Sequence, residues 1–206
     1  MMTTANKALI RLRAGNERFA AGKGGLSALL NHIQRDKSVG GQQPFAVILG
    51  CSDSRVPVEG VFDQALGDLF VIRVAGNIVA PSQIGSVEFA ADRYGTRLVV
   101  VLGHTKCGAV EATVSELQRP SGEASPNLQS IVSRISPAVA EVVKQNPHDD
   151  AEQLLAKAVR ANIMRSAIDL RHGSAIIENL AQNDGLRIVG AEYSLETGLV
   201  EFFDID

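Results

Sequence analysis

Three residues that can bind a soft metal ion follow two apolar segments of the chain. Cys51 comes one residue after the apolar run 45–49, and His104 and Cys107 follow the run 97–102. The spacing His-x2-Cys lets two ligands from one turn reach a single ion, and a third ligand from a neighbouring strand completes the set. Two sulfurs and one imidazole suit Zn²⁺, and three protein ligands leave the fourth tetrahedral position open, as in catalytic zinc sites.

The same residues have a plainer interpretation. Cys51 and Cys107 are the chain's two cysteines, and without a metal they would be buried free thiols beside a hydrogen-bonded core histidine. The N-terminal residues contain no apolar segment of the kind found in secretory signals, so we expect a cytoplasmic location. Thiols stay reduced there, which favours a metal or catalytic role over a disulfide.

A carboxylate and a guanidinium lie close to Cys51 in the sequence, at Asp53 and Arg55. Asp53 could accept a hydrogen bond from a zinc-bound water, and Arg55 could keep the carboxylate in place and ionised. The alternative is a turn in which Asp53 or Ser54 caps the following helix, with a local ion pair between Asp53 and Arg55.

Several other chemistries do not fit the chain. Thiolate enzymes that cradle an oxyanion use a Cys-x5-Arg loop, whereas Arg55 is the fourth residue after Cys51, and no glycine-rich phosphate motif follows a strand. A net charge of −3 and a pI near 5.8 argue against a nucleic-acid partner. The apolar runs are far shorter than the ~20 residues that span a bilayer, so we expect no membrane partner.

The elements that must position these residues alternate between strands and helices. Expected strands cover 45–49, 69–74, 97–102 and 186–191, with an antiparallel partner at 199–205, and expected helices cover 5–20, 82–94, 109–117, 127–145, 151–171 and 174–182. This alternation predicts an α/β fold: a mostly parallel central β-sheet with an antiparallel edge strand, flanked by helices. Sites in such sheets form beyond the carboxyl ends of the strands, which is where the three metal-binding residues fall.

The chain divides into an arm and one domain. Residues 5–20 carry an amphipathic helical pattern, and residues 22–43, rich in Gly, Gln and Ser, are typical of a loop. We therefore expect an N-terminal helical arm over residues 1–36 and a single zinc-binding α/β domain over residues 37–206.

Two segments resemble the signature segments of the β-class carbonic anhydrases. Residues 51–57 read Cys-Ser-Asp-Ser-Arg-Val-Pro, and residues 103–110 read Gly-His-Thr-Lys-Cys-Gly-Ala-Val. The resemblance continues over residues 62–77, 190–193 and 195–200. It implies a carbonate dehydratase, a lyase that hydrates CO₂ reversibly to bicarbonate and a proton.

The resemblance also implies roles for single residues. One Zn²⁺ per chain would be bound by Cys51, His104 and Cys107, and a zinc-bound hydroxide would be oriented by Asp53, which Arg55 holds.

The family's active site lies at a dimer interface, so a homo-oligomer, dimer or tetramer, is expected. The substrate pocket is expected to include Gln42, Phe70, Phe89 and Gly108, with the two phenylalanines in the apolar wall that a partner chain contributes.

Two further hypotheses about function use the same metal site. The scaffold could hydrolyse carbonyl sulfide or carbon disulfide, which are linear, apolar relatives of CO₂. It could also be a non-catalytic zinc domain in which Asp53 permanently fills the fourth position on the metal.

Overall fold

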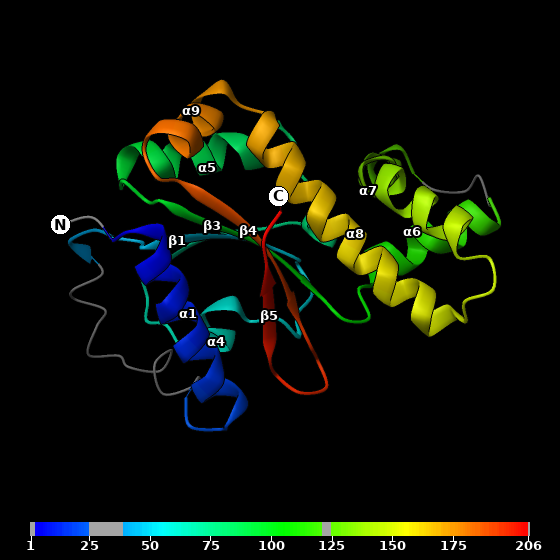
Figure 1. The fold of residues 1–206 in the computed structure, drawn as a ribbon, viewed down its shortest axis with the longest axis horizontal. Coiled ribbons are helices and arrows are strands. Elements are labelled where there is room, and N and C mark those ends of the chain that lie inside the picture. The colour runs from blue at the N-terminus through cyan, green and yellow to red at the C-terminus, as the bar shows by residue number, and fades with distance from the viewer. Residues whose placement is uncertain (1–2, 25–38, 121–124, 206) are drawn as a thin grey trace.

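The computed structural model describes residues 3–24, 39–120 and 125–205 of the chain. Its centre is a five-stranded sheet in the order β2-β1-β3-β4-β5. The strands are β1 (Ala46–Gly50), β2 (Leu69–Arg73), β3 (Leu98–His104), β4 (Arg187–Tyr193) and β5 (Val200–Phe203). All neighbouring pairs are parallel except β4 and β5. The structure therefore confirms the predicted α/β fold with an antiparallel edge strand (Figure 1).

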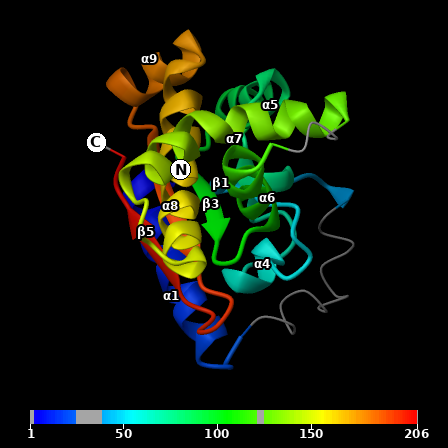
Figure 2. The same cartoon turned by 90° about the vertical axis from the view of Figure 1, so that its right-hand side faces the viewer.

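Helices cover both faces of the sheet, because the side chains of each strand alternate between two cores. Val47 and Leu49 of β1 face one core, while Ala46 and Ile48 face the other. The first core is covered by α5 (Pro81–Arg93), α6 (Gly108–Gln118), α7 (Pro126–Gln145), α8 (Ala151–His172) and α9 (Ala175–Asn183). The second is covered by α1 (Ala5–Ala20) and α4 (Val58–Val61). Figure 2 shows α6 and α7 in front, packed against α8.

Local sequence signals explain where the helices begin. Asp150 forms a capping box with Gln153 at the start of α8, and Ser125 caps α7. The sequence did not predict two short elements, α4 and a three-residue 3-10 helix, η2 (Ala75–Asn77). Both elements follow strands that end at the carboxyl edge of the sheet, and η2 becomes part of the site described below.

The N-terminal helix packs on the sheet of its own chain. Ala8 and Leu12 of α1 are fully buried in the second core. The predicted boundary between residues 36 and 37 lies outside the described residues, so the division into arm and domain stays a prediction. Among the described helices, none has both the length and the hydropathy needed to cross a membrane.

Candidate metal centre

The carboxyl ends of the neighbouring strands β1 and β3 bring three metal-binding side chains together. Gly50, the last residue of β1, lies opposite Leu102 of β3, so Cys51 comes next to the end of β3. His104 ends β3, and Cys107 follows after a two-residue turn. One donor atom from each of Cys51, His104 and Cys107 lies within 4.8 Å of the other two, and all three residues are buried. The sequence prediction that these three residues meet at the sheet edge thus agrees with the geometry.

The histidine at this cluster is prepared to bind a metal through Nε2. Its Nδ1 lies 2.9 Å from the carbonyl oxygen of Thr105, a contact that places the proton on Nδ1. Nε2 is buried and has no hydrogen-bond partner among the described residues. Because buried polar atoms are almost always satisfied, an unpartnered imidazole nitrogen next to two sulfurs fits a metal ligand.

The two thiols are coupled to each other. The nearby Cys107 thiol lowers the pKa of Cys51 well below its usual range, and the Cys51 thiolate together with burial raises the pKa of Cys107. The buried pair therefore holds one proton easily and a second only with difficulty. A dication can take the place of the shared proton, and two thiolates with one imidazole are a donor set that suits Zn²⁺.

An ion pair borders the cluster. Asp53 Oδ1 accepts hydrogen bonds from the backbone N–H and Nε of Arg55, both at 2.9 Å, and Oδ2 accepts from Nη2 at 2.7 Å. This bidentate contact holds the pKa of the Asp53 carboxyl well below its usual range, so Asp53 is ionised. Oδ2 of Asp53 also lies 3.8 Å from His104 Nε2. The helix after this segment, α4, has no side-chain cap, so Asp53 does not serve the alternative role of a helix cap.

A second arginine, which the sequence analysis did not assign to the site, holds the loop after β1. Arg73 ends β2, and it donates from Nε to the carbonyl oxygen of Cys51 at 3.0 Å and from Nη2 to that of Asp53 at 2.6 Å. The sequence contained one indication of this role: Arg73 is a cation at the end of the apolar strand β2. Its role depends on the pairing of β1 with β2, which the sequence alone does not specify.

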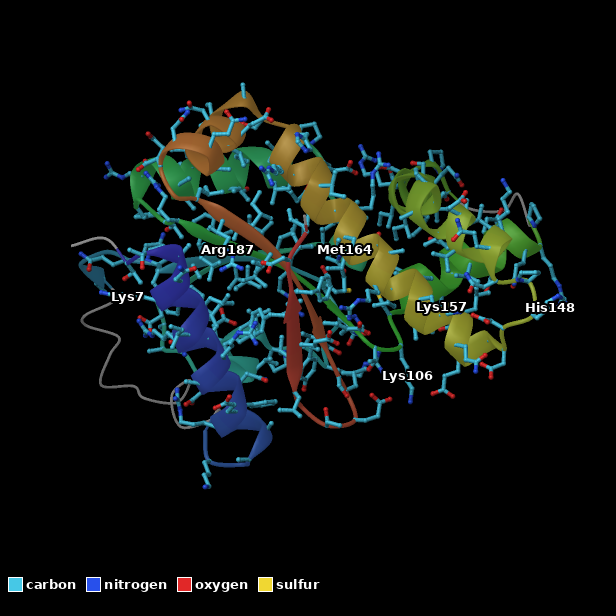
Figure 3. The ribbon with its side chains drawn as sticks, in the orientation of Figure 1. Lys7, Lys106, His148, Lys157, Met164 and Arg187 are labelled. Atoms are coloured by element: carbon cyan, nitrogen blue, oxygen red, sulfur yellow. The ribbon has the colours of Figure 1, made fainter. Side chains whose placement is uncertain are left out.

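The turn between His104 and Cys107 is held from the β4–β5 hairpin. Lys106 has the left-handed φ of 56°, and Figure 3 shows its side chain projecting from this turn. The Glu196 carboxylate accepts from Lys106 Nζ at 2.7 Å and from the Thr105 hydroxyl at 3.0 Å. The Lys106 carbonyl oxygen accepts from Arg55 Nη2 at 3.3 Å, so the turn also touches the Asp53–Arg55 pair.

Gly108 is next to the metal-binding cluster in the chain and borders open space. It is the first residue of α6, directly after Cys107, and it is exposed. A Cβ added there would meet no heavy atom of the described chain within 4 Å. The position is therefore open to solvent, and the place of Gly108 in the substrate pocket stays a prediction.

The other residues predicted for the substrate pocket lie at the opposite end of the sheet. Phe70, Phe89 and Tyr94 form a cluster of rings with centroids 5.8–6.2 Å apart, and Tyr94 was not predicted. Gln42 Nε2 donates to the Tyr94 hydroxyl at 2.8 Å. A cavity of about 440 Å³ adjoins this group, with Gln42 and Tyr94 in its wall. Gln42 precedes β1, whereas Cys51 follows it, and a five-residue strand is ~16 Å long. Within one chain, this group does not reach the metal centre.

Known proteins share both the sequence and the fold. Residues 46–200 match the carbonic anhydrase family. Carbonic anhydrase 2 of Mycobacterium tuberculosis is 37% identical over 191 residues, which cover 91% of this chain and 87% of that protein. A solved structure of the β-carbonic anhydrase CcaA has a TM-score of 0.77 and 26% identity, covering 96% of this chain and 95% of that one. A tetrameric β-carbonic anhydrase from Sordaria macrospora has a TM-score of 0.75 at 21% identity, covering 96% and 97%.

Proposed function

The chain belongs to the β-carbonic anhydrase family, and on that premise we propose that it catalyses the reversible hydration of CO₂ to bicarbonate and a proton. One observation carries the proposal. The Cys51–His104–Cys107 cluster is bordered by an ionised carboxylate, Asp53, whose Oδ2 lies 3.8 Å from His104 Nε2. A metal-binding set with an acceptor beside it is the arrangement that activation of water requires.

One Zn²⁺ per chain would be held by Cys51, His104 and Cys107. When bound, the ion supplies Lewis-acid chemistry that makes a water molecule acidic enough to be used near neutral pH. The chain's own residues then orient the reactants. Ionised Asp53 can only accept hydrogen bonds, so it would accept one from the O–H of the attacking oxygen. A lone pair of that oxygen is then directed at the carbon of CO₂. Arg55 keeps that carboxylate ionised and fixes its plane through the bidentate contact.

The substrate pocket is completed by a second copy of the chain. Gln42 is separated from its own Cys51 by the length of β1, while the rings of Phe70, Phe89 and Tyr94 gather at the same end as Gln42. Phe89 is 52% exposed, and an exposed aromatic group beside an amide donor is typical of a surface that meets a partner. We infer at least a homodimer in which these residues face the partner's metal centre, with a tetramer as a further possible assembly. A cytoplasmic location belongs to the same proposal, because the two thiolates must stay reduced to hold zinc.

Stopped-flow hydration of CO₂ by the zinc-loaded protein at pH 7 and pH 9 tests the proposal. Fast turnover that a small zinc-binding anion inhibits is the expected result, since Asp53 is engaged by Arg55 and leaves the metal's fourth position free. Turnover only at pH 9 would indicate that Asp53 occupies that position at lower pH. With one zinc per chain but no CO₂ turnover at either pH, the proposal fails. The same protein is then assayed with carbonyl sulfide, to separate a related hydrolase from a non-catalytic zinc domain.

A further inference from the structure

The two sulfurs of the metal centre receive backbone N–H groups from different sources. The backbone N–H groups of Ala109 and Val110, in the first turn of α6, favour the ionised form of the Cys107 sulfur. The Cys51 sulfur accepts a hydrogen bond from the N–H of Gly76, with N and Sγ 3.4 Å apart, and the backbone N–H of Asp53 also favours its ionised form. Helix α6 has 11 residues whose own hydrogen bonds hold its donors in place, whereas Gly76 lies in η2, which has only three.

Gly76 cannot be held by a side chain of its own. Its φ of 67° lies in the left-handed region. A Cβ at this position would lie 2.7 Å from Cδ1 of Ile135 and 3.2 Å from Cβ of Ala109, so a side chain here would have to displace Ile135 in addition to straining the left-handed backbone. The direction of its N–H therefore depends on the contacts that its backbone makes.

One of these contacts comes from a distant helix. Asn162 of α8 donates from Nδ2 to the carbonyl oxygen of Gly76 at 2.8 Å, across 86 positions of sequence. Asn162 is 1% exposed, and its neighbours one turn earlier on the same helix face, Ala158 and Val159, belong to the apolar core. A buried amide in such surroundings is costly unless it is hydrogen-bonded, so the Gly76 carbonyl is the partner that accounts for an asparagine at this position.

We propose that Asn162 is a positioning residue of the metal centre: it fixes Gly76 by the carbonyl oxygen, so that the N–H of the same residue stays directed at the Cys51 sulfur. The two contacts lie on either side of one Cα and leave this glycine little freedom to rotate. An N–H that points at a thiolate withdraws electron density from the sulfur and stabilises its ionised form, as other outer partners of metal ligands do. The inference rests on the ligand set of the proposed function, but not on the reaction with CO₂.

The test compares two asparagines with the same substitution, Asn162→Leu and Asn16→Leu. Asn16 is 3% exposed and donates from Nδ2 to the carbonyl oxygens of Val61 and Gly198, at 3.2 and 2.9 Å, on the other face of the sheet. It therefore matches Asn162 in burial and in the type of bond, without contact to η2. Zinc affinity is measured by competition with a chromophoric chelator. The Co²⁺-substituted protein reports the sulfur directly through its thiolate-to-metal charge-transfer band.

Asn162→Leu is expected to weaken zinc binding about 10-fold and to move the charge-transfer band to longer wavelength, because the Cys51 sulfur becomes more electron-rich. Asn16→Leu is expected to lower Tm and to change neither metal readout. Unchanged zinc affinity and an unchanged band in Asn162→Leu would overturn the inference, as would equal changes in Asn16→Leu. If Asn162→Leu does not fold, Asn162→Ala is measured against Asn16→Ala in the same way.

A wild-type chain that binds neither ion overturns both the ligand set and this inference. A wild-type chain that binds both ions but does not hydrate CO₂ overturns only the proposed function.

Discussion

The two ends of the β-sheet differ in the chemistry of their side chains. At the carboxyl end, the three metal-binding residues are buried, and two arginines hold the loop beside them: Arg55 donates to the Asp53 carboxylate and Arg73 to the Asp53 carbonyl oxygen. At the amino end, Gln42 and Tyr94 line a cavity, Tyr94 packs with the rings of Phe70 and Phe89, and Phe89 is about half exposed. The first end has the groups for chemistry and little apolar wall, while the second has apolar wall and an amide but no metal ligand. This difference is the basis of the proposal that each active site combines the carboxyl end of one copy with the amino end of another.

The contrast has a simple origin in the sheet. Parallel neighbours place all their carboxyl ends at one edge, so residues that follow β1 and β3 meet without help from another chain. Residues that precede β1 meet those at the end of α5 at the opposite edge, as Gln42 and Tyr94 do. Because a strand separates the two edges by ~16 Å, no rotamer change can join them within one copy.

Removing a metal ligand tests the carboxyl end most severely. Cys107→Ala deletes one of three ligands, and we expect zinc content to fall from one per chain to nearly none, with CO₂ hydration at background. Zinc is measured by atomic absorption after gel filtration. The far-UV circular dichroism spectrum controls for loss of fold. Full zinc occupancy in a folded Cys107→Ala protein would show that this thiol is not a ligand.

Asp53→Asn tests the chemistry while keeping the metal. The amide retains the shape of the side chain but replaces an acceptor oxygen with a donor. We expect kcat/KM to fall by about 10²–10⁴, as for other positioned acid–base groups, with zinc content unchanged. Glu201→Gln is the matched control, since Glu201 also forms a bidentate pair with an arginine, Arg160, but on the edge strand β5. Near-wild-type turnover in Asp53→Asn would remove Asp53 from the mechanism.

Mixing two defective chains tests whether the amino end acts on a partner. Gln42→Ala should lower kcat/KM by roughly 10-fold through loss of an orienting hydrogen bond. Gln42→Ala and Asp53→Asn chains are co-expressed in equal amounts. A site is then intact only if its Asp53 comes from a Gln42→Ala chain and its Gln42 comes from an Asp53→Asn chain. Random assembly then restores about a quarter of the wild-type activity to the mixture.

The alternative geometry predicts a different result for the same mixture. If Gln42 served the metal centre of its own chain, every site would carry one of the two substitutions, whichever partner it met. The mixture would then show only the average of the two separate activities. That outcome would also contradict the proposal that the two ends of the sheet belong to different copies of one site.

The sequence predicted the carboxyl end much better than the amino end. Cys51, His104 and Cys107 directly follow apolar strands, so pattern and chemistry coincide and the prediction needs no tertiary information. Arg73 and Asn162 were missed because their roles depend on which strand and helix become neighbours. Those pairings are set by packing of the whole core, not by local pattern.

The same reasoning explains why Tyr94 and the short elements were not predicted. Tyr94 ends a helix and gave no signal of its own, but the fold places it against Gln42 and Phe70. The helix η2 is three residues long and is shaped by a left-handed glycine, below the length at which hydrophobic periodicity can be detected. Strand ends differed by one to two residues at most positions, which did not disturb the prediction of the metal ligands.

Glu196→Gln probes the smallest effect at the carboxyl end, the tie between the hairpin and the metal-binding turn. Contacts with Lys106 and Thr105 lower the pKa of Glu196 to about 2 from its ordinary 4.5. A carboxyl with a depressed pKa stabilises the fold fully above about pH 4.5, and this contribution is lost as the pH falls through about 2. Because the side chain is exposed, we expect Glu196→Gln to lower Tm by only roughly 2 °C at pH 7, and the difference in Tm from wild type to shrink below pH 4.5.

Repeating the Glu196→Gln substitution in a Lys106→Met background should reduce the difference in Tm at pH 7, since one partner is already absent. A difference that stays constant from pH 7 to pH 3 would mean that the charge of Glu196 does not stabilise this turn.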